Sequence, residues 1–274
     1  MSADLPRLLG DWGPAQLAAS MIAAYLVVGE PFVGWVLHRR FEGRLRSDPA
    51  ARRSFYRRLL VLEWGLTAVA AVVWAAAGSV RAAQVGLAWP RRWPGPVTVV
   101  LCLLLLALVV LSTRALRSGA LAGPPPGAAG PPRRHRPGDA RHAEPPGAST
   151  MALLPRTRAE RRLFAAVGVT AGVCEEWLYR GFFLALLSAL FRGLPTVVLV
   201  LAAAAAFGLA HVYQGVTGIV TTGVLGGVLA AVYLGTGSLL LPVLLHAAID
   251  LRFLLVPSSA LPTIAPGGRP AAAR

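Results

Sequence analysis

Two adjacent carboxylates and an arginine lie inside a long apolar segment of this 274-residue chain, at Glu175, Glu176 and Arg180. Moving an ionisable side chain to the centre of a bilayer costs on the order of 2.5 to 3.5 kcal/mol on insertion scales, so such groups mark functional sites by default. Glu176 and Arg180 are four residues apart, in the favourable order for a helical ion pair. We therefore expect Arg180 to neutralise Glu176 and to leave Glu175 for another task.

Two further polar clusters occur in the apolar runs that follow. His211 comes four residues after Phe207, and Asp250 comes four residues after His246, so each pair shares a helix face. One Glu with two His supplies what water activation requires. The carboxylate or an imidazole takes the proton, and imidazole hydrogen bonds or a metal lower the pKa of the water. Asp250 would either orient His246 by accepting a hydrogen bond or act as a ligand itself.

Each cluster also has a purely structural interpretation. Glu176 with Arg180 would only make a charge tolerable inside a helix bundle. His246 with Asp250 would clamp two helices together, and His211 would only pack and hydrogen-bond. A proton or ion pathway uses the same residue types and is the main competing function. The combination of the three clusters favours water activation over these separate explanations.

Seven apolar runs are long enough to cross about 30 Å of hydrocarbon, which takes roughly 20 residues. With 55% hydrophobic and 14% charged residues, the composition predicts an all-α fold, a polytopic membrane helix bundle of about seven transmembrane helices. A rise of about 1.5 Å per residue puts Glu175, His211 and His246 between mid-membrane and the cytoplasmic side, so that they can converge. The runs cover residues 15–37, 59–80, 96–114, 163–190, 195–213, 216–234 and 238–256.

The arginines set the predicted orientation. The 27 cationic side chains are all Arg and outnumber the 12 acidic ones, but most lie between apolar runs, a pattern of membrane topology that does not indicate a nucleic-acid partner. The Arg-dense segments 39–58 and 114–162 are expected in the cytoplasm by the positive-inside rule. We predict a multi-pass protein of the cell membrane, in contact with membrane lipid, with its N-terminus outside and its C-terminus cytoplasmic.

Three other polar groups are given no chemistry at this point. Glu30 is expected to pair with the Arg-rich loop at a helix end, and Glu63 is expected to snorkel to the interface. His38 is assigned to the basic loop. The sequence leaves open whether Glu30 reaches the reactive residues.

Composition divides the chain into four parts. A Pro/Gly/Arg-rich segment cannot bury enough apolar surface to fold alone and is predicted to be a cytoplasmic linker. Gly223 and Gly227 either let two helices approach closely or reflect an Ala-rich composition. The predicted parts are a three-span N-terminal membrane part, the linker, a four-span membrane domain and a C-terminal tail, at residues 1–117, 118–150, 151–256 and 257–274.

The three clusters resemble the ordered motifs of the CPBP family, the CAAX protease and bacteriocin-processing membrane proteins, also called Abi proteins. The type II CAAX prenyl endopeptidases belong to this family. The resemblance covers roughly residues 160–256 and implies a CPBP-like catalytic membrane domain, an intramembrane peptidase whose cavity opens toward the cytoplasm. The matching residues are Glu175-Glu176-x-x-x-Arg180-Gly181, then Phe207-x-x-x-His211, then His246-x-x-x-Asp250.

The resemblance also implies roles for the three reactive residues. Glu175 would activate the water, His211 would assist it or bind a metal, and His246 would bind or stabilise the oxyanion. Two schemes stay open for the cofactor. One divalent metal such as Zn would be held by these three residues, or the glutamate would act without a metal.

Four motif positions would support the site, namely Glu176, Arg180, Phe207 and Asp250. The last motif ends in Asn or Asp in the family. An ionised Asp250 accepts a hydrogen bond but cannot donate one. The resemblance therefore does not imply that Asp250 stabilises an oxyanion as an Asn at this position could.

The expected function is that of an intramembrane endopeptidase of glutamic or metallo type. Its partner would be a membrane-associated peptide or protein substrate, with or without a lipid anchor. Two alternatives are a non-proteolytic binding or immunity protein on the same scaffold and a small proton-coupled transporter. The intact set Glu175, His211 and His246 favours the peptidase, and the duplicated or inverted halves that would favour transport are not found in the sequence.

Overall fold

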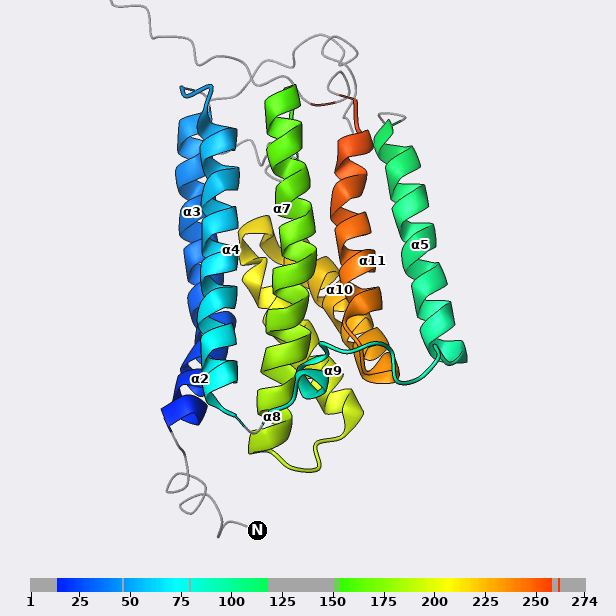
Figure 1. Cartoon of the computed structure of the whole chain (residues 1–274). Coiled ribbons are helices and arrows are strands. Elements are labelled where there is room, and N and C mark those ends of the chain that lie inside the picture. Colours follow the sequence, from blue (N-terminus) through cyan, green and yellow to red (C-terminus); the bar gives the residue numbers. More distant parts are fainter. Residues whose placement is uncertain are drawn as a thin grey trace, which may run out of the picture.

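The computed structural model describes residues 14–45, 47–78, 80–117, 151, 153–257 and 261. Every regular element in these ranges is a helix, which confirms the predicted all-α bundle (Figure 1). The predicted linker at 118–150 lies outside the described residues, as does most of the predicted tail. The division into an N-terminal part and a catalytic domain stays a prediction.

A helix forms in each predicted apolar run of the described chain. The first run is one long helix made of α2 (Pro14–Ala24), the π-helical turn η1 (Tyr25–Gly29) and α3 (Glu30–Leu45). It is followed by α4 (Ala51–Ala76), the short 3-10 helix η2 (Ala82–Val85) and α5 (Pro96–Arg117). The fourth run comprises α7 (Arg158–Glu176), a second π-helix η3 (Trp177–Phe183) and α8 (Leu184–Leu190). The remaining helices are α9 (Thr196–Ala210), η4 (Val212–Gln214), α10 (Gly215–Thr236), α11 (Leu240–Leu251) and η5 (Arg252–Leu255).

Four helices of the described chain are long and apolar enough to cross a membrane. They are Pro14–Leu45, Ala51–Ala76, Pro96–Ala115 and Val212–Thr236, while the apolar helix Thr196–Ala210 is shorter. These lengths and compositions indicate a membrane protein. The count of seven spans and the orientation of the termini stay predictions.

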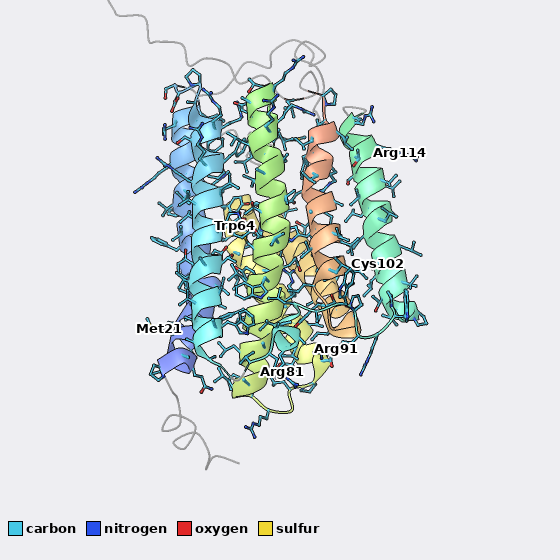
Figure 2. All side chains as sticks on the ribbon, in the orientation of Figure 1. Met21, Trp64, Arg81, Arg91, Cys102 and Arg114 are labelled. Atoms are coloured by element: carbon cyan, nitrogen blue, oxygen red, sulfur yellow. The ribbon has the colours of Figure 1, made fainter. Side chains whose placement is uncertain are left out.

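α7 lies at the centre of the bundle, where it packs against α4 and α11 (Figure 1). α9 and α10 pack on one another behind it, and α5 stands against α10 and α11. Arg81 and Arg91 lie at one end of the bundle and Arg114 at the other (Figure 2). Between these ends the outer faces carry exposed apolar side chains such as Met21. This distribution suits helices whose outer surface contacts lipid.

The helix that carries the two adjacent carboxylates starts with a reciprocal cap. The Thr157 hydroxyl accepts the Glu160 N–H at 3.2 Å, and Glu160 Oε2 accepts the N–H groups of Thr157 and Arg156 at 3.0 and 2.8 Å. These bonds satisfy N–H groups that have no partner within the helix. The cap therefore fixes the start of α7 about five turns before Glu175.

α9 and α10 come together through glycines. A Cβ atom on Gly208 would lie 2.6 Å from the Ile219 carbonyl oxygen and 3.1 Å from the Cα of Gly223. A Cβ atom on Gly223 would lie 3.2 Å from the Ala204 carbonyl oxygen. The interpretation of Gly223 as a close-packing residue is therefore confirmed. This contact holds the end of α9, with Phe207 and His211, against α10.

Substituting Gly208 tests how much the bundle depends on this contact. We expect Gly208→Ala to lower the stability by about 1–3 kcal/mol, because the new methyl group overlaps backbone atoms that cannot rotate away. Gly65→Ala in α4, where a Cβ atom meets nothing within 4 Å, is the matched control and should be neutral or stabilising. The measurement is the thermal unfolding temperature in detergent. Equal temperatures for the two variants would contradict the expected overlap.

Candidate active site

The two adjacent carboxylates lie where α7 changes from α-helical to π-helical geometry. Glu176 is the last residue of α7, and η3 follows at Trp177–Phe183. Such π-helical turns are rare and occur frequently at functional sites. Gly181 within η3 is in close contact with the end of η2, because a Cβ atom there would lie 2.5 Å from the Val85 carbonyl oxygen. The glycine of the first motif is thus explained by packing.

Glu176 and Arg180 form the predicted ion pair. Arg180 Nη1 lies 3.1 Å from Glu176 Oε1, and both side chains are 0% exposed. Arg180 Nη2 also donates to the Gly226 carbonyl oxygen at 3.2 Å, and the guanidinium carbon lies 4.2 Å from the centroid of the Phe207 ring. The arginine is therefore held by α10 and α9 as well as by its own helix.

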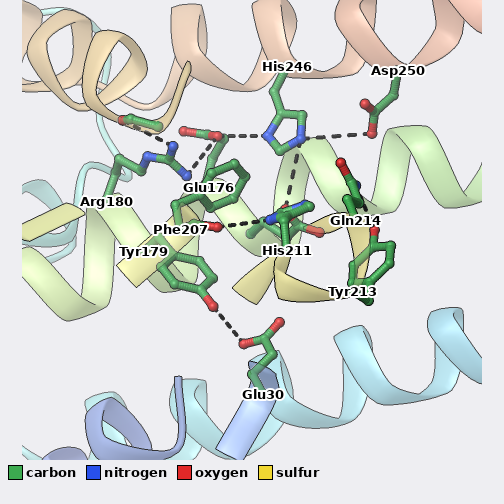
Figure 3. A network of polar contacts seen from close by, with 12 residues as sticks. Glu30, Glu176, Tyr179, Arg180, Phe207, His211, Tyr213, Gln214, His246 and Asp250 are labelled. Atoms are coloured by element: carbon green, nitrogen blue, oxygen red, sulfur yellow. Dashed lines mark hydrogen bonds and ion pairs between the residues drawn. The ribbon is translucent and has the colours of Figure 1, made fainter. Parts of the chain in front are cut away.

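Glu176 has a second partner that the sequence analysis did not identify. His246 Nδ1 lies 2.7 Å from Glu176 Oε1 (Figure 3). A carboxylate only accepts hydrogen bonds, so Nδ1 carries the proton and Nε2 points to the other side of the ring. The expected orienting role of Asp250 is thus taken by Glu176, which links Arg180 to His246.

Two carboxylates flank the free nitrogen of His246. Glu175 Oε2 lies 3.9 Å from Nε2, and Asp250 Oδ2 lies 3.8 Å from the same atom. Both distances are too long for a direct hydrogen bond. Glu175 Oε2 is shielded from solvent and has no hydrogen-bond partner among the described residues. Glu175 is therefore the carboxylate that is available to a molecule in this space, as expected for a base.

His211 is oriented by its own helix. It ends α9, and its Nδ1 lies 2.9 Å from the Phe207 carbonyl oxygen. The carbonyl oxygen only accepts, so Nδ1 carries the proton and Nε2 is left to accept one. The Phe207 ring packs against the rings of His211 and His246, with centroids 4.8 and 5.7 Å away. Phe207 thus contacts both histidine rings, and its supporting role stays a prediction.

One cavity of about 410 Å³ brings the three reactive residues together. Its lining includes Glu175, His211, His246 and Asp250. The first three residues therefore face one cavity, as the comparison of their depths predicted. The lining also includes residues that the sequence analysis did not assign to the site, among them Tyr213, Gln214, Glu30, Glu63 and His38.

Three expectations for the N-terminal helices were wrong. Glu30 does not pair with the Arg-rich loop, because its Oε2 accepts a hydrogen bond from the Tyr179 hydroxyl at 2.8 Å. Glu63 does not snorkel, because its Oε2 is shielded from solvent. His38 lies in α3 rather than in a loop, is 4% exposed and approaches Glu42 to 3.1 Å. A charge inside an apolar run was the one sequence signal that could have assigned Glu30 and Glu63 to the cavity.

The proposed metal ligands do not fit a metal ion in this arrangement. In the part of the chain that the structure describes, no group of three or more His, Cys, Asp or Glu side chains is placed to hold one. Glu175, His211 and His246 share a cavity but do not converge on one point at ligand distance. The geometry of these donors therefore does not support the metal scheme, one of the two that the sequence left open.

Comparison with known proteins gives one match. The family model described as type II CAAX prenyl endopeptidase Rce1-like matches residues 159–252. This segment holds the three motifs from Glu175 to Asp250. Neither a curated protein nor a solved structure matches the chain. The match over residues 159–252 supports the resemblance of this segment to the CPBP/CAAX protease family.

Proposed function

We propose that the chain is an intramembrane endopeptidase that hydrolyses a peptide bond in a membrane-associated peptide or protein with a glutamate-activated water. One observation carries the proposal. Glu175 presents a shielded, unpartnered carboxylate oxygen in the cavity that His211 and His246 also line. Groups that take a proton and groups that stabilise charge are thus available to one bound peptide.

In the proposed reaction, Glu175 removes a proton from a water molecule, and the water oxygen attacks the carbonyl carbon of the scissile bond. The electron pair of the carbonyl moves to its oxygen. When the tetrahedral intermediate collapses, the C–N bond breaks and the proton held by Glu175 passes to the leaving amine. His211 Nε2 accepts a hydrogen bond from the water and so orients it.

His246 serves the oxyanion in this scheme. With a second proton on Nε2, its imidazolium donates to the oxyanion while Nδ1–H donates to Glu176. The negative charge of Glu176 stabilises the imidazolium, and Asp250 adds to this effect from 3.8 Å. Arg180 pairs with Glu176 inside the apolar bundle and so balances its charge. These supporting residues act through His246 and not on the peptide.

One prediction from this mechanism concerns Glu175→Gln, which keeps the shape of the side chain and removes the base. We expect cleavage to fall about 10²- to 10⁴-fold, the range of a general base. Peptide termini in membrane fractions are compared by mass spectrometry between cells with the wild type and cells with the variant, at matched protein levels. Glu42→Gln, on the cytoplasmic half of α3 by the predicted topology, is the control and should keep all termini.

Termini that appear only with an intact Glu175 would identify the substrate and the bond together. If every terminus is independent of Glu175, and the variant supports whatever phenotype deletion produces, proteolysis is abandoned. A binding or transport function on the same scaffold would then be tested instead.

A second prediction separates the roles of the buried ion pair. Glu176→Gln leaves the Arg180 guanidinium buried without its carboxylate, which should cost about 3–5 kcal/mol of stability. Adding Arg180→Met removes both charges and should restore most of the thermal unfolding temperature. Cleavage should stay reduced by roughly tenfold or more, because the His246 imidazolium still lacks the negative charge that Glu176 places at Nδ1. A double variant that cleaves like the wild type would show that Glu176 only balances Arg180.

A further inference from the structure

Two carboxylates of the cavity come from helices outside the matched segment. Glu30 is the first residue of α3, and Glu63 lies in α4. Both line the cavity that Glu175 and Asp250 also line. In Figure 3, Glu30 lies across His211 from His246, so the cavity has acidic groups on both sides of the proposed reaction centre.

These carboxylates lack cationic partners. Glu30 Oε2 accepts a hydrogen bond from the neutral Tyr179 hydroxyl at 2.8 Å. Glu63 Oε2 is shielded from solvent and has no hydrogen-bond partner among the described residues. An ionised carboxylate in a shielded place is stabilised by a cation or by hydrogen-bond donors. Glu30 and Glu63 therefore offer acceptor oxygens to a donor group that enters the cavity.

No cationic side chain of the described lining forms an ion pair with Glu30 or Glu63. Among the described residues, the arginine in the lining is Arg252. Its guanidinium donates to the Ile249 carbonyl oxygen, and its guanidinium carbon lies 4.3 Å from the centroid of the Phe253 ring. His38 approaches Glu42 on its own helix. Much of the remaining lining on this side is aliphatic, with Leu37, Leu59, Leu62 and Leu66. The cavity thus suits an apolar chain that carries a positive charge.

We infer that Glu30 and Glu63 bind a cationic side chain of the substrate, so that the enzyme selects peptides with an Arg or Lys beside the scissile bond. The inference rests on the proposed function, because it describes the substrate of the same cavity. The cation donates hydrogen bonds to the two carboxylates that face it without a charged partner, and such charge-assisted bonds are stronger than neutral ones. A free terminal carboxylate at the same place is repelled.

The test is a binding measurement on the full chain carrying Glu175→Gln, in detergent micelles, so that no turnover occurs. The probes are dye-labelled apolar peptides in which arginine is moved through each position, each with a twin that carries the neutral isostere citrulline. We expect the arginine peptide to bind about tenfold or more tightly than its twin at one position or at neighbouring positions. Glu63→Gln combined with Glu30→Gln should reduce this ratio to within about threefold.

Two controls make the result specific. Glu42→Gln removes an equal charge from α3 outside the cavity lining and should leave the ratio unchanged. The thermal unfolding temperature of each variant shows whether it is folded, and the comparison of arginine with citrulline on the parent chain needs no cavity substitution.

Several outcomes would overturn the inference. Equal binding of the arginine peptide and its citrulline twin at every position would do so. This result is expected if Glu63 is held as a neutral acid. A preference that survives loss of both carboxylates would do so as well. Cleavage that requires Glu175 but ignores arginine leaves the proposed function in place and removes the cation site. An arginine preference that depends on Glu30 and Glu63 without any cleavage supports the cation site and removes the peptidase.

Discussion

The fully buried ion pair between Glu176 and Arg180 is the interaction on which the rest of the site depends. The desolvation penalty of burying both charges is offset only when further hydrogen bonds and contacts satisfy them. Those partners are the His246 imidazole, the Gly226 carbonyl oxygen and the Phe207 ring, which come from α11, α10 and α9. The need to satisfy this buried ion pair therefore ties α9, α10 and α11 to the helix that carries Glu176 and Arg180. The contacts that stabilise the bundle are the same contacts that position the site residues.

The same requirement separates two carboxylates that are neighbours in sequence. Successive residues of a helix point about 100° apart, so Glu176 turns into the packed bundle while Glu175 faces the cavity. Glu176 is committed to Arg180 and His246, whereas Glu175 keeps an oxygen without a partner. Paired titratable groups in unlike environments commonly divide acid, base and supporting roles between them. The double glutamate of the motif is thus two different functional groups.

The sequence was sufficient for the features that depend on local spacing. The all-α class followed from the apolar runs, and the Glu176–Arg180 pair followed from a four-residue interval on one helix. The contact of Glu176 with His246 joins residues 70 positions apart, and that of Tyr179 with Glu30 spans 149 positions. Such contacts depend on how helices are placed and on the π-helical turns at η1 and η3, for which no sequence rule was available.

The contributions of the two halves differ in kind. The matched segment 159–252 carries Glu175, His211 and His246 with the residues that contact them, whereas α3 and α4 bring Glu30, Glu63 and much apolar surface to the cavity. A cavity of about 410 Å³ accommodates only a short piece of a chain, so each carboxylate in its wall acts on that piece at short range. Under the proposed function, exchanging α3 and α4 would change which peptides are accepted and would leave Glu175, His211 and His246 in place. The search for substrate preference therefore begins with Glu30 and Glu63, in helices that carry no motif.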